Sequence, residues 1–257
     1  MTAQPDHDEV VRQSFEKQVG LFDGDDALFA RRADPAVSWL GPLSPDMIVL
    51  DVACGAGHVA ETVAPYVRQV VGVDVTPALL ALGSARLSDA GVRNVLLLDG
   101  NAARLPFVDA SFDVVACRTA LHHFGDQEKA VAEMARVCRR GGRVVVNDLV
   151  APNADVRDAF DGLHRLIDPS HAGVLLPNEL SELLASAVGP VASAETTKPF
   201  RLPIDVMLTD AADREAVMVA LHAELDGGPP SGFEPVLDDG RMTVAFTATT
   251  VQAVRDA

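Results

Sequence analysis

Residues 49–57 read VLDVACGAG, with an aspartate inside an apolar run and two glycines just after it. The apolar run predicts a buried strand, and GAGHVA at 55–60 follows as the opening of a helix. Glycine lets backbone amides come close to a ligand, and a helix N-terminus favours negative charge. A carboxylate has no evident use inside a buried strand, so Asp51 predicts a contact with a ligand or with the loop amides. The segment therefore predicts a nucleoside-cofactor site at a strand–turn–helix junction.

Strands and helices alternate on both sides of this segment. Apolar runs predict strands at 47–53, 69–75, 94–100, 112–118 and 141–150, separated by helical segments. Continuous apolar strands are typical of a sheet that helices cover on both faces. The order predicts an α/β fold with a doubly wound, Rossmann-like sheet of seven mostly parallel strands. An alternating run at 241–254 predicts a C-terminal antiparallel strand that pairs with a strand at 191–202.

The composition argues against several classes of partner. The net charge is −16, and the chain has one Trp and one Tyr. Such a surface repels nucleic acids and anionic membranes, and it lacks the aromatic residues that stack on single-stranded bases. No apolar run approaches the ~18 residues of a membrane span, and the polar start predicts no signal peptide. Three cysteines without a C-x-x-C spacing complete the expectation of a reduced, cytoplasmic protein.

Five segments in order carry a family resemblance. They are VLDVACGAG, VVGVDVTPALL, LLLDGNAARLPF, FDVVACRTALHHF and VCRRGGRVVVND. Together they resemble the class I S-adenosylmethionine (SAM) dependent methyltransferases, in the branch of the ubiquinone/menaquinone-biosynthesis C-methyltransferases. The resemblance is strong over about 45–150 and weak in the flanks. The first family motif runs acidic-x-Gly-x-Gly-x-Gly, and Ala53 departs from it at the first glycine, which this branch tolerates.

The resemblance implies a set of cofactor contacts. The residues are Asp51, Ala53, Gly55, Gly57, Asp74, Val75, Asn101, Ala102 and Arg118. Asp51 would serve the methionine ammonium, Asp74 the two ribose hydroxyls, and Asn101 with the Ala102 amide the adenine. Asp51 would also repel the pyrophosphate of a dinucleotide. One alternative is that Asp51 only shapes the loop, and another is that Asp74 caps the next helix, although Thr76 fits that cap better. Asn101 is alternatively a turn residue. Asp99 is the weaker candidate for the adenine contact.

Three histidines are the catalytic candidates. His122 and His123 follow the fourth strand and, being adjacent, are expected to point in different directions. His171 lies in LIDPSHAGVLLPNELSELL, a stretch that resembles one lying over the acceptor in the same branch, and Asp168 would orient it. The alternatives are ordinary hydrogen bonds for the first pair and a surface loop for His171. No Cys/His/Asp spacing indicates a metal site, and no G-x-S-x-G indicates a hydrolase.

These patterns predict three regions and one reaction. Residues 1–45 form a helical lid segment, 46–150 the SAM-binding core, and 151–257 the acceptor-side cap with the final strands. The predicted reaction moves a methyl group by in-line displacement to the carbon or oxygen of a small, hydrophobic metabolite, and both flanks are expected to close over the site. The partner is this small-molecule acceptor, and an oligomer is possible. A nicotinamide-dependent oxidoreductase and a non-catalytic SAM-binding regulatory partner are the alternatives.

Overall fold

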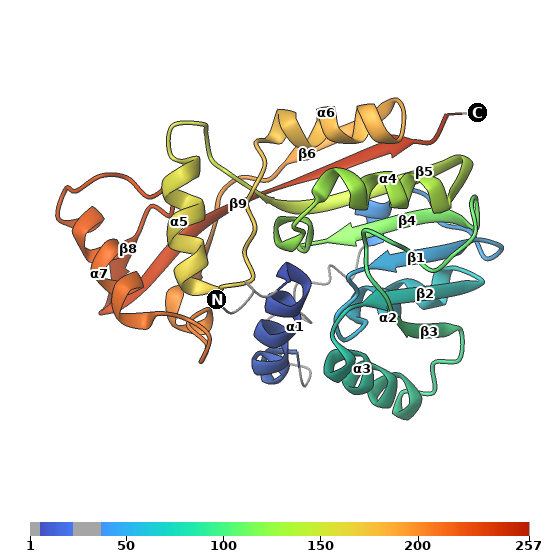
Figure 1. The fold of residues 1–257 in the computed structure, drawn as a ribbon, viewed down its shortest axis with the longest axis horizontal. Coiled ribbons are helices and arrows are strands. Elements are labelled where there is room, and N and C mark those ends of the chain that lie inside the picture. The colour runs from blue at the N-terminus through green and yellow to red at the C-terminus, as the bar shows by residue number, and fades with distance from the viewer. Residues whose placement is uncertain (1–5, 23–36, 257) are drawn as a thin grey trace.

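A twisted, mostly parallel sheet forms the centre of the molecule (Figure 1). The computed structural model describes residues 6–22 and 37–256, and its main sheet runs in the order β3-β2-β1-β4-β5-β9-β6. The strands are β1 (Ile48–Val52), β2 (Gln69–Asp74), β3 (Val95–Asp99), β4 (Phe112–Arg118), β5 (Cys138–Val150), β6 (Val191–Thr196), β7 (Phe200–Pro203), β8 (Val236–Asp238) and β9 (Arg241–Val254). Strands β1 to β5 are parallel, whereas β9 is antiparallel to both β5 and β6. The predicted fold class is confirmed.

Helices cover both faces of this sheet. Those that pack on its faces are α2 (His58–Val63), α3 (Pro77–Asp89), α4 (Gln127–Val137) and α6 (Pro177–Ala187), whereas α1 (His7–Lys17), α5 (Arg157–Ile167) and α7 (Arg214–Leu225) lie outside the two faces. Successive strand residues point to opposite faces. Val49 accordingly packs with Val63 of α2, while Leu50 belongs to the core that holds Met134 of α4 and Leu184 of α6. Burial on both faces explains why these strands read as continuous apolar runs.

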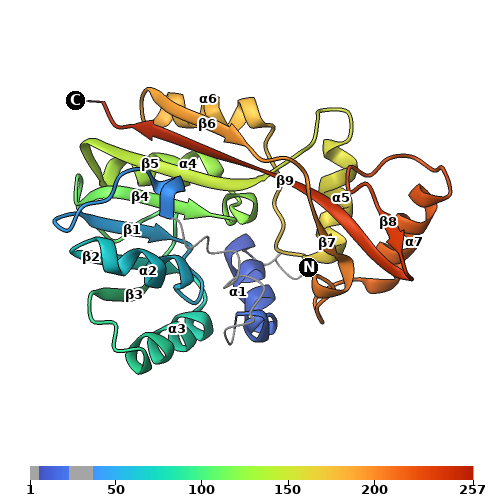
Figure 2. The same ribbon diagram turned by 180° about the vertical axis from the view of Figure 1, so that it is seen from behind.

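Strand β9 joins the main sheet to a second, smaller one. Its C-terminal part pairs with β5 and β6, and its N-terminal part pairs with β7 and β8 (Figure 2). A separate apolar core built around Phe160, Phe233 and Phe246 fills the space between this extension and helices α5 and α7. The sequence predicts a single strand over 191–202, where the structure has β6 and β7 with a break between them, and it does not predict β8.

Helix α1 lies at the carboxyl ends of the parallel strands (Figure 1). The sequence predicts a helical segment over 8–40. The structure shows α1, a short 3₁₀ turn at Val19–Leu21 and another at Val37–Leu40, and the rest of that prediction lies outside the described residues. Within the described ranges, no helix is both long and apolar enough to cross a bilayer.

Candidate active site

A cavity of about 540 Å³ lies at the carboxyl edge of the sheet, beneath α1. Open α/β sheets bind ligands at this edge, and the volume falls within the range of about 300–1,000 Å³ that is usual for ligand sites. Its walls come from α1, the glycine loop, the ends of β2 and β4, the turn after β4, and the cap. The cavity therefore lies where all three predicted regions meet.

The glycine loop turns sharply at three positive φ angles. These are 56° at Ala53, 54° at Gly55 and 74° at Gly57. Positive φ is costly for a residue with a Cβ, so Ala53 adopts the strained conformation at the place where the family motif has glycine. Gly55 lines the cavity. A Cβ on Gly57 would instead meet Leu97 at 3.2 Å, so Gly57 shapes the packing behind the loop and lies outside the cavity wall.

Asp51 brings a buried carboxylate to the cavity wall. The residue is 2% exposed, and its Oδ2 atom has no hydrogen-bond partner among the residues that the structure describes. Burial raises the pKa of Asp51 to about 7, although the positive charge of Arg118 acts in the opposite direction. A buried carboxylate oxygen without a donor is costly by itself. A cationic ligand group would both supply the donor and favour the ionised form, so the site fits the ammonium of SAM.

Asp74 links the loop to the start of α3. Its Oδ2 accepts a hydrogen bond from the Gly55 amide at 2.8 Å, and its Oδ1 accepts one from the Thr76 amide at 2.8 Å. Burial raises the pKa of this carboxyl, and the two amide bonds act in the opposite direction. Thr76 occupies the cap position of α3 without a side-chain cap bond. Each Asp74 oxygen has a second lone pair, so the carboxylate can still accept from a vicinal diol.

The remaining predicted cofactor residues also line the cavity. They are Ala53, Val75, Asn101, Ala102 and Arg118. Asn101 Oδ1 accepts from the Ala103 amide at 2.7 Å, and its side-chain amide donates to Asp8 of α1. Both ends of Asn101 are therefore engaged, which orients the side chain but makes Asp8 a competitor for any ligand at this position. The role of Asn101 toward adenine stays a prediction.

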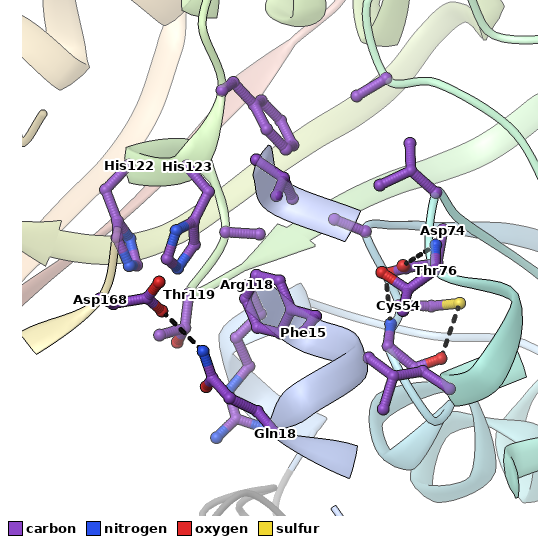
Figure 3. Close-up of a pocket in the computed structure, with 18 of the residues that line it drawn as sticks. Phe15, Gln18, Cys54, Asp74, Thr76, Arg118, Thr119, His122, His123 and Asp168 are labelled. Carbon is purple, nitrogen blue, oxygen red and sulfur yellow. Dashed lines mark hydrogen bonds between the residues drawn. The ribbon is translucent and has the colours of Figure 1, made fainter. Parts of the chain in front are cut away.

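His122 and His123 both face the cavity from the 3₁₀ turn Leu121–His123 (Figure 3). Their ring centroids are 4.1 Å apart. The expectation that they point in different directions is wrong, because the tight turn lets the two long side chains converge. Each ring is anchored on its Nδ1 atom, which lies 2.6 Å from Asp148 Oδ1 for His122 and 2.9 Å from Ser170 Oγ for His123.

The hydrogen bonds around His123 fix its tautomer. Ser170 Oγ donates to Asp168 Oδ1 at 2.6 Å and has no second proton to give. His123 must therefore donate from Nδ1 to Ser170, which leaves a lone pair on Nε2. Burial and neighbouring His122 lower the pKa of His123 to about 3, so the ring is neutral near pH 7. Asp168 thus orients His123 through Ser170, whereas the sequence predicts that it orients His171.

His171 lies behind the cavity wall. Its side chain is 0% exposed, its Nε2 is 2.7 Å from Asp161 Oδ1, and its ring stacks on His164 at 4.1 Å. His164, on α5, lines the cavity, but the sequence analysis does not single it out. The sequence offers one signal for His164, which is a histidine on the apolar face of an amphipathic helix. This signal is weak because residues at such positions usually belong to the core.

The cap closes the histidine end of the cavity with apolar side chains. They come from β5, α5, β7, the turn before α7 and β9, namely Leu149, Ile167, Leu202, Met207 and Phe246. Helix α1 closes the cavity from the other side. Figure 3 shows Phe15 and Gln18 between the histidines and Asp74, and Gln18 Nε2 donates to Asp168 Oδ2 at 3.1 Å. The cavity therefore has a polar end, an apolar end and a helical roof.

The chain matches known methyltransferases. A family model described as a methyltransferase domain matches residues 50–146. The uncharacterized methyltransferase YcgJ of Bacillus subtilis is 41% identical over 157 residues, which is 61% of each chain. The ubiquinone/menaquinone biosynthesis C-methyltransferase UbiE of Shewanella frigidimarina is 29% identical over 184 residues, which covers 69% of this chain and 73% of UbiE. This chain thus spans about three fifths of the YcgJ sequence.

Two solved structures extend the match to most of the chain. The YcgJ crystal structure has a TM-score of 0.73 and 28% identity over 90% of this chain and 97% of YcgJ. The BH2331 structure from Bacillus halodurans has a TM-score of 0.77 and 27% identity over 88% of this chain and 100% of the BH2331 chain. Residues 50–146 therefore match a methyltransferase domain, and the chain as a whole resembles the class I SAM-dependent methyltransferases. Its resemblance to the UbiE branch, predicted from the sequence motifs, is confirmed.

Proposed function

We propose that this protein transfers the methyl group of SAM to a small, mostly apolar acceptor. One observation carries the proposal: a single cavity joins the carboxylates of Asp51 and Asp74 to the rings of His122 and His123. A carboxylate pair suits the ammonium and ribose of the cofactor, and the apolar end suits an acceptor. Similarity to UbiE, whose name gives it as a C-methyltransferase, favours a carbon acceptor.

The glycine loop and the strand ends would hold the cofactor. Asp51 Oδ2 would take the ammonium, Asp74 the ribose hydroxyls, and the segment of Asn101 and Ala102 the adenine. Once bound, SAM supplies a methyl group on a sulfonium, and the sulfur keeps the bonding electrons as the acceptor atom takes the methyl. The role of these residues is to position and desolvate, which supplies most of the rate in such a displacement.

The histidine end would hold the acceptor. His123 Nε2 has an available lone pair, and the Ser170–Asp168 chain fixes its direction. It can accept a hydrogen bond from the acceptor and so orient it, whereas its low pKa makes it a weak base. His122 is held by Asp148 at the same wall, while His171 supports the wall from behind. Among the three predicted catalytic histidines, the geometry favours His123 for direct contact with the acceptor.

The alternatives fit the site less well. The pyrophosphate of a nicotinamide dinucleotide would come close to the Asp51 carboxylate, which disfavours an oxidoreductase. A SAM-binding regulatory partner without activity needs no acceptor pocket, yet the histidine end continues the cavity with anchored rings and an apolar cap. Methyl transfer accounts for both ends of the cavity.

Calorimetry with SAM, S-adenosylhomocysteine and NAD tests the cofactor assignment. We expect the first two to bind, and Asp74→Ala to weaken both by roughly 10- to 150-fold, because hydrogen bonds to a charged group contribute about 1.5–3 kcal/mol. Asp89→Ala, an exposed carboxylate at the end of α3, is the matched control and should bind normally. Binding of NAD in place of SAM would overturn the proposal. A screen of small acceptors for S-adenosylhomocysteine release then tests the reaction.

A further inference from the structure

Three buried histidines meet in the wall of the acceptor end. His122 comes from the turn after β4, His164 from α5, and His171 from the loop after α5. One ring nitrogen of each lies within 4.8 Å of those of the other two. Imidazole is the most common protein ligand of Zn²⁺ and related divalent ions, and three histidines make a complete protein ligand set for an open zinc site.

Each ring of this cluster keeps one nitrogen that the hydrogen bonds described above do not use, and we take these as the inner nitrogens. His164 Nδ1 and His171 Nδ1 are buried and have no hydrogen-bond partner in the described part of the chain. The bond from His122 Nδ1 to Asp148 leaves Nε2 as the ligand atom of that ring. Buried polar atoms without partners are rare because each costs about 1–3 kcal/mol. Two such atoms in one cluster indicate that a bound species normally satisfies them.

The outer nitrogens have the partners that metal-binding histidines usually have. Asp148 binds the outer nitrogen of His122 at 2.6 Å, and Asp161 binds that of His171 at 2.7 Å. Backbone amides hold both carboxylates, from His122 to Asp148 at 2.9 Å and from Val174 to Asp161 at 3.0 Å. Carboxylates in this position orient the ring, fix its tautomer and raise its basicity toward a metal.

We propose that His122, His164 and His171 bind a divalent transition-metal ion that takes an oxygen of the methyl acceptor as a further ligand. His122 and His164 line the cavity, so the open side of the ion would face the acceptor end, whereas His171 closes the rear. Bonds of about 2.0–2.1 Å in a tetrahedron place ligand nitrogens about 3.3 Å apart, so the rings of His164 and His171, which stack with planes 20° apart, would have to rotate toward the ion on binding.

The ion defines the chemical class of the acceptor, and this part rests on the proposed methyl transfer. A metal-held carbonyl oxygen is polarised, which acidifies the C–H bond next to it. The C–H proton is lost to solvent water, and the electron pair left on the acceptor carbon forms the new bond to the methyl carbon. The sulfur of SAM keeps the pair of the broken bond. The site therefore selects a small carbonyl compound with an enolisable C–H.

Metal binding is measured directly on the full-length protein. Protein freed of metal by a chelator is titrated with Co²⁺, followed by visible absorption, and with Zn²⁺, followed by elemental analysis after gel filtration. We expect one ion per chain. His164→Leu and His171→Leu keep most of the packing volume, remove a ligand nitrogen, and should weaken binding at least 100-fold. Asp161→Asn should weaken it by about 10- to 100-fold.

Control variants separate a metal site from a structural cluster. His222→Ala removes an exposed histidine of α7 and should bind Co²⁺ as the wild type does. Circular dichroism checks that each variant is folded, and Asp161→Asn, which keeps all three rings, remains informative if the leucine variants do not fold. If the wild type binds no ion, or if His222→Ala and Asp161→Asn behave alike, the cluster is a structural one satisfied by water and the metal proposal is overturned.

The same proteins separate this proposal from the proposed reaction. Affinity for S-adenosylhomocysteine should be unchanged in His164→Leu, because that residue lies at the acceptor end. Turnover of an enolisable carbonyl compound should disappear with the chelator and return with Zn²⁺ or another divalent ion. Metal binding without any SAM affinity would overturn the methyltransferase proposal and keep the metal site. If the protein binds SAM and its turnover resists the chelator, the metal proposal is overturned and the methyltransferase proposal stands.

Discussion

At the scale of single residues, Asp51 connects stability to cofactor binding. Burial raises its pKa to about 7, from the ordinary value of 3.8. Between these two pH values the folded protein holds a proton that the unfolded chain has released, so folding is favoured at low pH. This stability is complete below about pH 4 and is lost as the pH rises through about 7. At about 1.4 kcal/mol per pKa unit, the loss is up to about 4 kcal/mol.

The variant Asp51→Asn tests this link. Without ligand at pH 8, it should be more stable than the wild type by about 1–4 kcal/mol, and the difference should shrink toward pH 5. Its affinity for SAM should fall at least tenfold, since the ammonium loses a charged partner. Urea unfolding at both pH values and calorimetry with SAM measure the two effects. Parallel stability curves for the two proteins would show that Asp51 is not a buried acid in the folded state.

At the scale of elements, the glycine loop depends on how closely α3 approaches it. A Cβ at Gly83 of α3 would lie 2.3 Å from the carbonyl oxygen of Ala56, whereas a Cβ at Gly162 of α5 would meet nothing within 4 Å. The same Gly→Ala change should therefore have opposite effects in the two helices. Gly83→Ala should lose about 1–3 kcal/mol of stability and weaken SAM binding, because the loop must shift. Gly162→Ala should gain about 0.5–1 kcal/mol from reduced chain entropy.

Thermal or urea unfolding, with SAM calorimetry beside it, measures both changes. If Gly83→Ala binds SAM normally, helix α3 does not set the shape of the loop.

The burial and pairing of individual strands explain which of them can be predicted from the sequence. The runs at 47–53 and 112–118 are predictable because burial on both sheet faces leaves apolar residues there, apart from Asp51 and Arg118 at the ligand edge and Asp113 at the opposite end of β4. Strand β8 is exposed along its whole length and exists only because it pairs with β9, so no local pattern marks it. The three-histidine cluster is also invisible, because its members come from separate elements and never form a ligand spacing along the chain.

At the scale of the whole molecule, α1 joins the cofactor side to the cap. Arg12 Nε donates to the Val75 carbonyl at 3.2 Å on the cofactor side. On the cap side, Ser14 Oγ and Gln18 Nε2 donate to Asp168 at 2.8 and 3.1 Å. The same carboxylate accepts from Ser170, and although burial acts in the opposite direction, nearby His123 and the bonds from Ser170 and Gln18 lower the pKa of Asp168 to about 2. Because α1 lines one side of the cavity, we expect ligands to exchange faster when these bonds open.

The double variant Ser14→Ala/Gln18→Ala should therefore open the roof more often. Each hydrogen bond to a charged group contributes about 1.5–3 kcal/mol, so even one uncompensated loss predicts at least a tenfold faster exchange of S-adenosylhomocysteine. Hydrogen exchange of the α1 amides should rise in parallel, with that of the central strands unchanged. Gln13→Ala, on the exposed side of the same helix, is the matched control, since among the described residues the Gln13 side chain bonds only Glu9. Stopped-flow binding and exchange mass spectrometry give the two rates. If both rates match those of the Gln13→Ala control, α1 is a fixed wall of the cavity and its bonds to Asp168 serve only to position His123.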